Sequence, residues 1–393
     1  MNKRSIRDLD LQSKRVLVRV DFNVPVKDGR VTDDTRIVRA LPTIRHLLSE
    51  GARPILISHL GRPKGEPDPK YAMNPVAAKL GELLGEPVLK LDAAVGPEVE
   101  GALEDWDGRG VVLLENSRFY PGETTNDPDF SDQLAALADL YVHDAFGAAH
   151  RAHATTVGVA ERLPAAAGLL LEGEIDYLDG ILQDPERPFV AILGGAKVSD
   201  KLGVIESLLR TADSLLVGGA MCFTFFQAQG YEVGESLVED DYLEEARRLM
   251  DEAGERLVLP VDMVVAEKME EGAGAGTVEV KDIPSGKMGL DIGPETVALF
   301  EETIAGARTI FWNGPMGVFE IDAFAKGTEG VARAVAAASS GGATSVIGGG
   351  DSVAAVNKLG LEDRMSHIST GGGASLEYIE GKELPGVAVL PDK

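Results

Sequence analysis

The hydrophobic positions of this chain fall into short, nearly continuous runs separated by longer amphipathic segments. Apolar residues within the runs do not alternate with polar ones, which is typical of parallel strands covered on both faces. We predict strands at Arg15–Val20, Pro54–Ser58, Val111–Glu115, Leu140–His143, Phe189–Leu193, Ser214–Val217, Leu257–Val261, Thr309–Trp312 and Ala343–Ile347. The segments between them repeat apolar residues at helical spacing and predict helices at Thr35–Glu50, Pro75–Leu84, Lys201–Ala212 and Asp240–Ala253.

Strands that alternate with helices predict an α/β fold with right-handed crossovers. Roughly a dozen strands would overload one open sheet, so we expect two doubly wound parallel-sheet (Rossmann-like) domains. A helix-like stretch, Leu169–Leu182, separates the two series of strands. The expected organisation is a first domain over 1–168, a second over 169–377 that opens with a hinge helix at 169–184, and a C-terminal tail over 378–393 that packs back on the first domain.

Composition places the chain among globular proteins of the cytoplasm. Of its 393 residues, 44% are hydrophobic and 26% charged, close to the averages of globular domains. The single cysteine, Cys222, excludes an internal disulfide and a thiolate metal cage. No run approaches the ~18 apolar residues of a membrane span, and the N-terminus lacks the apolar core of a signal peptide. We therefore expect a cytoplasmic protein without a membrane partner.

The charge balance limits the possible ligands further. Lys and Arg number 38 against 64 Asp and Glu, which gives a net charge of −26. A field of that sign repels nucleic acid and anionic lipid over most of the surface. An anionic ligand must therefore be attracted by a local cluster of positive charge.

Arginine and histidine gather after the predicted strands of the first half. Ligands of open parallel sheets bind beyond the carboxyl ends of the strands, so these residues are expected at one edge. Five of the six histidines lie at or before position 153. The segments are Asp21-Phe22-Asn23, His59-Leu60-Gly61-Arg62, Asn116-Ser117-Arg118, Asp144-Ala145-Phe146-Gly147 and His150-Arg151-Ala152-His153, with Arg36 at the start of the first helix.

A lone arginine at a strand end is usually a solvated surface residue or the partner of a nearby carboxylate. A series of strand ends that carry arginine or histidine is harder to assign to chance, and guanidinium groups bind carboxylate and phosphate. We therefore predict a small, multiply anionic substrate in the first domain. A zinc site of His143, His150 and His153 is an alternative, although the chain has no metalloprotease helix motif to support it.

The strand ends of the second half are rich in glycine, which lets a backbone approach phosphate closely. Lys197 and Lys201 are expected on one helical face beside such a site, and Asp351 would meet a hydrated Mg²⁺ held mainly by phosphates. These features predict a nucleotide site. The segments are Gly194-Gly195-Ala196-Lys197, Gly218-Gly219-Ala220, Asn313-Gly314-Pro315-Met316-Gly317, Gly348-Gly349-Gly350-Asp351-Ser352 and Gly371-Gly372-Gly373-Ala374-Ser375.

The glycine pattern differs from two familiar nucleotide motifs. The P-loop sequence does not occur in the chain. Gly272–Gly276 lacks the spacing of a dinucleotide fingerprint, and Thr277–Val280 continues as a strand, which predicts an exposed turn at the glycines. A lone Gly-Gly pair is usually a tight turn or a helix cap, but glycine clusters at five strand ends favour a ligand site.

Several of these segments are long and unusual, and together they resemble the motifs of the phosphoglycerate kinase family. The resemblance covers essentially the whole chain, in the family's order. The matching strings are Arg19-Val20-Asp21-Phe22-Asn23-Val24-Pro25, His59-Leu60-Gly61-Arg62-Pro63, Glu115-Asn116-Ser117-Arg118-Phe119, Gly194-Gly195-Ala196-Lys197-Val198-Ser199-Asp200-Lys201, Trp312-Asn313-Gly314-Pro315-Met316-Gly317-Val318-Phe319-Glu320 and Ser369-Thr370-Gly371-Gly372-Gly373-Ala374-Ser375.

The resemblance implies roles for individual residues. It implies that 3-phosphoglycerate binds at Asp21, Phe22, Asn23, Arg36, His59, Leu60, Gly61, Arg62, Arg118 and Arg151. It implies that ADP or ATP with Mg²⁺ binds at Lys201, Glu320, Gly349, Gly350, Asp351 and Ser352, with Asp351 nearest the metal. It implies that Arg36, Lys197, Gly371, Gly372 and Gly373 surround the phosphoryl group during transfer.

The implied reaction is reversible phosphoryl transfer between 1,3-bisphosphoglycerate and ADP, which gives 3-phosphoglycerate and ATP. It is expected to proceed by hinge closure and charge stabilisation in a monomer, without a general base. The segment Gly168–Glu174 departs from the family's pattern, and Gly173 inside it weakens a helix by about 1 kcal/mol. Two alternatives remain open from the residues alone: a bilobed kinase of another acidic metabolite, and an anion-binding scaffold without turnover.

Overall fold

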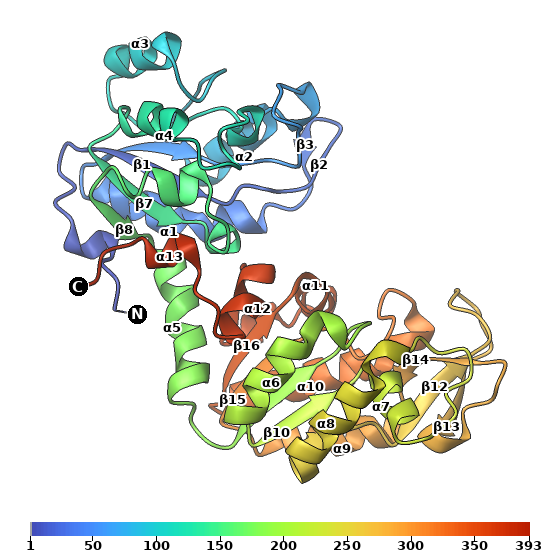
Figure 1. Cartoon of the computed structure of the whole chain (residues 1–393). Helices are drawn as coiled ribbons and strands as arrows, with labels where there is room; N and C mark the ends of the chain where they lie inside the picture. Colours follow the sequence, from blue (N-terminus) through green and yellow to red (C-terminus); the bar gives the residue numbers. More distant parts are fainter. Residues whose placement is uncertain (1) are drawn as a thin grey trace. The chain divides into compact units, whose positions relative to one another are not determined.

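Two six-stranded sheets organise the chain, which the computed structural model describes over residues 2–393 (Figure 1). Every strand pairing within these two sheets is parallel. The first sheet has the order β5-β6-β4-β1-β7-β8, from Val88–Lys90, Val111–Leu113, Arg53–Ile57, Arg15–Val20, Leu140–Asp144 and Ala165–Ala167. The second has the order β11-β10-β9-β15-β16-β17, from Leu257–Val258, Ser214–Val217, Phe189–Leu193, Thr309–Asn313, Thr344–Gly348 and His367–Ile368.

Helices connect the parallel strands, as right-handed crossovers require. The helices are α1 Thr35–Ser49, α2 Asn74–Leu84, α3 Pro97–Asp105, α4 Pro128–Ala135, α5 Leu169–Gln183, α6 Leu202–Thr211, α7 Cys222–Ala228, α8 Leu243–Ala253, α9 Pro294–Ala305, α10 Lys326–Ser340, α11 Gly350–Lys358, α12 Gly373–Ile379 and α13 Pro385–Ala388. Within residues 2–393, none of these helices is long and apolar enough to cross a membrane. The α/β fold of two parallel sheets predicted from the sequence is confirmed.

The chain forms two compact units. Unit 1 consists of Met1–Asp176 and Glu383–Lys393, and unit 2 of Tyr177–Lys382, so the division falls within α5. In unit 1 the C-terminal segment joins the N-terminal one through a bridge between Lys3 and Asp392, and Figure 1 shows the two chain ends close together. The predicted domain boundaries after 168 and 377 lie near these limits and stay predictions, as does the hinge role of 169–184.

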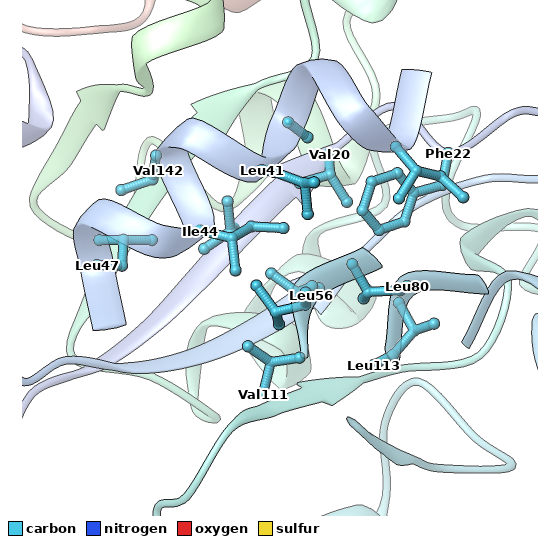
Figure 2. Close-up of a cluster of buried hydrophobic side chains, with 14 of the residues drawn as sticks. Val20, Phe22, Leu41, Ile44, Leu47, Leu56, Leu80, Val111, Leu113 and Val142 are labelled. Atoms are coloured by element: carbon cyan, nitrogen blue, oxygen red, sulfur yellow. The ribbon is translucent and has the colours of Figure 1, made fainter. Parts of the chain in front are cut away.

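The core of unit 1 forms where α1 packs on its sheet. Figure 2 shows Leu41, Ile44 and Leu47 of α1 pointing toward Leu56 of β4 and Val20 at the end of β1. All five side chains are buried, which follows from apolar residues at helical spacing on one element and in a continuous run on the other. This packing fixes the first turn of α1 beside the end of β1.

Most predicted strands match the observed ones within a residue or two. Arg15–Val20, Phe189–Leu193 and Ser214–Val217 are confirmed without change. The strand predicted at Leu257–Val261 ends at Val258, because Pro260 has no N–H to donate to a neighbouring strand. A 3₁₀ turn precedes α8, which therefore begins later than predicted.

A three-stranded sheet in unit 2 was largely missed by the hydrophobic pattern. Its order is β13-β12-β14, from Gly276–Glu279, Asp262–Ala266 and Met288–Ile292, and both pairings are antiparallel. Only β13 was expected. Asp262 is the first residue of β12, and its carboxylate caps α9: Oδ1 accepts from the backbone N–H of Thr296 at 2.8 Å and Oδ2 from that of Glu295 at 3.1 Å.

The start of α5 is held by two side chains of unit 1. Asp144, at the end of β7, accepts from the N–H of Leu170 at 3.0 Å, and Thr43 Oγ1 of α1 accepts from that of Leu169 at 2.9 Å. These bonds satisfy donors that a helix start leaves unpaired. Burial raises the pKa of the Asp144 carboxyl to about 7. The first turn of α5 is thereby tied to the sheet of unit 1.

Replacing Gly173 by alanine is expected to raise the free energy of unfolding by about 1 kcal/mol, because alanine is the better helix former. Gly173 lies inside α5, and a Cβ there would meet no atom within 4 Å. Urea unfolding followed by circular dichroism measures the change. Gly61→Ala is the matched control and should destabilise, because Gly61 has a φ of +62° and a Cβ there would lie 2.2 Å from the Tyr71 ring. A Gly173→Ala variant no more stable than the parent would contradict this assignment.

Candidate active site

The carboxyl ends of β4, β1 and β7 lie side by side in unit 1. The chain passes from β1 to β4 on one side and returns to β7 on the other, so the direction of strand order reverses at β1. Ligands of doubly wound sheets bind at such a reversal. The candidate residues after these strands therefore share one edge.

A cluster of positive charge surrounds His59 at this edge. We call it the basic cluster, and its members are Arg19, Arg36, His59, Arg62, Arg118 and Arg151. His59 is 7% exposed. Burial, together with the charges of Arg19, Arg118, Arg36 and Arg151, holds the pKa of His59 well below its usual value. The arginines act on one another too, since burial and the charges of Arg151, Arg19 and Arg62 lower the pKa of Arg118.

Asn116 fixes the loops that carry this cluster. Its Oδ1 accepts from the backbone N–H groups of Leu60 at 3.2 Å and Arg118 at 3.1 Å. Its Nδ2 donates to the carbonyl groups of Leu60 at 2.8 Å and Tyr71 at 3.0 Å. The side chain is fully buried, so these four bonds replace water that it would otherwise bind. One amide thus sets the register of three segments.

Asp21 and Asn23 form hydrogen bonds with residues in and beside the basic cluster. Asp21 Oδ2 accepts from Nη1 of Arg36 at 2.7 Å, and Asn23 Oδ1 accepts from the N–H of Gly61 at 2.8 Å. Phe22 and Leu60 have buried side chains, and Phe22 belongs to the apolar core shown in Figure 2. Their side chains therefore pack inside the unit, whereas Arg62 and Arg151 are exposed.

The three histidines of the zinc alternative occupy different environments. His143 is completely buried, and burial lowers its pKa to about 3. The Nδ1 of His153 lies 3.8 Å from Oε1 of Glu123, and burial together with the arginines lowers its pKa to about 4. Within residues 2–393, no three His, Cys, Asp or Glu side chains are grouped so as to hold a metal ion.

In unit 2 the strand order reverses between β9 and β15, and glycines follow both strands. The N–H of Gly194 donates to the carbonyl of Asn313 at 3.0 Å. A Cβ at Gly194 would lie 2.0 Å from the carbonyl oxygen of Pro315, so only glycine lets these two loops meet. Backbone rather than side chains forms this edge.

Lys201 is half-buried beneath these loops. Its Nζ donates to the carbonyl of Gly194 at 2.6 Å and to Asn313 at the carbonyl (2.9 Å) and at Oδ1 (2.6 Å). Burial lowers the pKa of Lys201 to about 8, against the opposing charges of Asp351 and Asp200. Lys197 is exposed. The two lysines do not share a helical face as predicted, because α6 begins only at Leu202.

An unpaired donor points toward the glycine loop after β16. Nδ2 of Asn313 is buried without a hydrogen-bond partner in the described part of the chain. A Cβ at Gly349, whose φ is +85°, would lie 2.9 Å from this nitrogen. Gly350 starts α11, with Asp351 exposed in the first turn and Ser352 buried. Ser352 Oγ accepts from the N–H of Gly314 and joins the two glycine loops.

A cavity of about 740 Å³ opens beside these loops. Gly195 and Gly219 line it, together with the carboxylate side chains Glu235, Asp291, Glu320 and Asp351. The apolar side chains that line it are Phe223, Leu237, Met263, Met269, Met288, Leu290, Met316, Val318 and Ile321. A cavity with apolar walls and few polar groups is typical of a small-molecule site.

The glycine segment Gly371–Gly373 leads into α12. Gly373 is the first residue of that helix, and Gly372 precedes it with a φ of +53°. The N–H of Gly371 donates to Ser369 Oγ at 3.1 Å, and the hydroxyl groups of Ser369 and Ser375 lie 2.6 Å apart. The predicted helix start at Gly371–Gly373 is therefore present.

The sequence did not assign a functional role to three polar residues of these sites, Arg19, Asn116 and Asn313. Arg19 interrupts the apolar run of β1, a signal that could have marked it. Asn116 and Asn313 stood inside quoted motifs, but nothing in their spacing showed which groups they bind. The methionines of β12 and β14 gave no signal, because those strands were not predicted.

Comparisons with known proteins agree along the whole chain. A family model described as phosphoglycerate kinase matches residues 6–382. A phosphoglycerate kinase of Rubrobacter xylanophilus is 78% identical over 393 residues, which cover 100% of this chain and 99% of the relative. One from Synechococcus elongatus is 58% identical over 400 residues, with 100% of both chains covered.

Solved structures give the same result. The phosphoglycerate kinase of Coxiella burnetii matches with a TM-score of 0.88 and 42% identity over 98% of each chain. That of Pyrococcus horikoshii matches with a TM-score of 0.85 and 34% identity over 98% of each chain. The chain therefore belongs to the phosphoglycerate kinase family, glycolytic phosphotransferases that move a phosphoryl group reversibly between 1,3-bisphosphoglycerate and ADP.

Proposed function

We propose that the basic cluster of unit 1 binds 3-phosphoglycerate or 1,3-bisphosphoglycerate. The observation that carries this proposal is the gathering of arginines around buried His59 in a chain of net charge −26. Guanidinium groups suit both the phosphate and the carboxylate of the substrate. The residues proposed to line the site are Asp21, Asn23, Arg36, His59, Gly61, Arg62, Arg118 and Arg151, with Phe22 and Leu60 contributing backbone only.

The nucleotide is proposed to bind in the cavity of unit 2. Its base would occupy the apolar part, and its phosphates would meet Gly349, Gly350 and Ser352 at the start of α11. Lys201 is half-buried beside that loop, and Nδ2 of Asn313 would supply a donor that has no partner in the described chain. The carboxylate of Glu320, which lines the cavity, is proposed to accept from sugar hydroxyl groups.

Mg²⁺ is proposed to arrive with the nucleotide. The described chain offers the exposed carboxylate of Asp351 in the cavity but no cage of three acidic or histidine ligands. This donor set fits Mg²⁺, which keeps several waters and is commonly held by phosphates with one or two carboxylates. When bound, the ion would neutralise phosphate charge next to Asp351.

The chemical step is proposed to rest on charge stabilisation. A carboxylate or a phosphate oxygen is already a nucleophile, so transfer needs no general base. Negative charge spreads over the oxygens of the moving group, and Arg36, Lys197 and the backbone at Gly371–Gly373 would stabilise it. Monomeric action in the cytoplasm also stays a prediction, which sedimentation and cell fractionation would test.

Arg36→Ala should lower kcat by about 10²–10³-fold, because it removes a charge that meets the transferring group. The affinity for ADP should stay the same, since ADP is proposed to bind unit 2. Steady-state kinetics and nucleotide titration measure both. Arg39→Ala, an exposed arginine of the same helix, is the matched control. A kcat near the parent's would reject the role of Arg36.

ADP affinity should fall as the pH rises from 7 to 9. Lys201 has a pKa of about 8 and loses its charge across this range, whereas the terminal phosphate of ADP is already ionised. Titration calorimetry should show about a three- to tenfold weaker affinity at pH 9. Lys201→Met should bind ADP weakly at both pH values, and Lys326→Met, which removes an exposed lysine of α10, should behave like the parent. An affinity independent of pH in the parent contradicts the proposal.

Closure of the two units is proposed as the step that excludes water, because water would otherwise capture the phosphoryl group. Small-angle X-ray scattering should show a smaller radius of gyration with 3-phosphoglycerate and a non-hydrolysable MgATP analogue together. Each ligand alone should have a smaller effect. An unchanged radius with both ligands bound would count against closure and against a hinge at 169–184.

A further inference from the structure

Three of the five N–H donors of the Arg19 guanidinium have partners inside unit 1. Arg19 is 1% exposed, and each of its three nitrogens has a partner. Nε bonds to Oγ1 of Thr155 at 2.8 Å, Nη1 to the carbonyl of Val20, and Nη2 to Nδ1 of His59 at 3.0 Å. Arg19 is therefore buried and held in place next to His59.

The donor and the acceptor of each of these hydrogen bonds can be assigned. The hydroxyl of Thr155 donates to Oε1 of buried Glu123 at 2.6 Å, and the N–H of Thr155 donates to Oε2 at 3.1 Å. The hydroxyl proton is therefore used, and Oγ1 of Thr155 accepts from Arg19. A guanidinium group has only donors, so Arg19 also donates to His59. The order of donation fixes where the protons lie.

The proton of His59 follows from this order. Because Nδ1 accepts from Arg19, it carries a lone pair, and the single ring proton of the neutral imidazole lies on Nε2. Turning the ring over would place a carbon against Nη2 and remove that hydrogen bond. The contact thus selects one tautomer and one orientation of the ring.

We propose that Arg19 is a positioning residue that holds His59 as the neutral Nε2–H tautomer, so that His59 serves the basic cluster as a hydrogen-bond donor and not as a further positive charge. This inference rests on the proposed binding of the acidic substrate in unit 1. Arg19 acts through His59 and does not touch the substrate.

The electrostatic surroundings of His59 support the neutral form. The charged groups that act on it come from four segments: Arg19 on β1, Arg36 on α1, Arg118 after β6 and Arg151 before the turn Ala154–Gly158. All four are cationic, and burial acts in the same direction on the pKa of His59. A neutral donor therefore keeps its hydrogen bond to an anion across the range in which a free histidine would titrate.

Nitrogen-15 NMR of the full-length protein, labelled at histidine, tests the tautomer directly. The His59 signal is identified by its absence in His59→Gln. The expected spectrum shows a protonated Nε2, an unprotonated Nδ1 and no titration between pH 5 and pH 8, roughly the window in which histidines change charge. An Nδ1–H tautomer or an imidazolium at pH 7 would overturn the proposal, and this measurement needs no change at Arg19.

Replacement of Arg19 tests its positioning role. Arg19→Met should let His59 titrate, raise the KM for 3-phosphoglycerate about tenfold at pH 7 and make that KM depend on pH, with a smaller change in kcat. Arg19→Lys keeps the positive charge but lacks the planar guanidinium group. Compared with Arg19→Met, it should restore the stability of the fold more than the affinity for 3-phosphoglycerate. Arg15→Gln, at the opposite end of β1, is the matched control and should leave the His59 signal unchanged. A His59 signal and a pH profile unchanged in Arg19→Met would overturn the role of Arg19.

The substrate assignment can fail separately. Addition of 3-phosphoglycerate should shift the Nε2 signal of His59. If the tautomer is as expected but the substrate leaves this signal unmoved, the proposed binding site in unit 1 is wrong while the control of His59 by Arg19 stands.

Discussion

Electrostatic repulsion among the clustered arginines is the main constraint on the structure of the proposed site in unit 1. Burial and neighbouring arginines lower the pKa of Arg118, so these groups are held together against their mutual repulsion. The folded chain sustains this arrangement with fixed hydrogen bonds, such as those of Asn116, and with a carboxylate partner for Arg36 at 2.7 Å. An anion that binds in the cluster reduces the repulsion among these cations. The electrostatic attraction for an anion is therefore strongest at the site where the unliganded protein has the greatest repulsion.

The proposed nucleotide site of unit 2 is built differently. There the loops after β9, β15 and β16 bring backbone close to backbone, and glycine at Gly194 is required for the approach. The charged side chain beneath them, Lys201, is fully hydrogen-bonded to carbonyl groups and to Asn313. Charged side chains therefore dominate the electrostatics of the proposed site in unit 1, whereas backbone dipoles dominate those of the proposed site in unit 2. The difference is consistent with the proposal that unit 1 binds a small acid with two anionic ends and unit 2 a polyphosphate.

The sequence supported some parts of this description better than others. Buried parallel strands are continuous apolar runs, so β1, β9 and β10 could be located to the residue. The β12–β14 sheet escaped prediction because Asp262 and Asp291 lie inside it, buried where they accept backbone N–H groups. Membership of the family could be inferred from long motifs, and the comparisons confirm it, which decides against a non-catalytic scaffold. The partners of Asn116 and the order of protons along Arg19 and His59 required coordinates, since they depend on contacts between distant segments.

The joining of both chain ends in unit 1 has a consequence for biosynthesis. Unit 2 is a continuous stretch, Tyr177–Lys382, whereas unit 1 includes Glu383–Lys393. Those residues follow every segment of unit 2 in the chain, so they are synthesised after it. The bridge between Lys3 and Asp392 and the bond from the Gly386 N–H to the Ala149 carbonyl, at 2.9 Å, can therefore form only after unit 2 has been synthesised. Unit 1, which has segments on both sides of unit 2 in the chain, is therefore completed after unit 2.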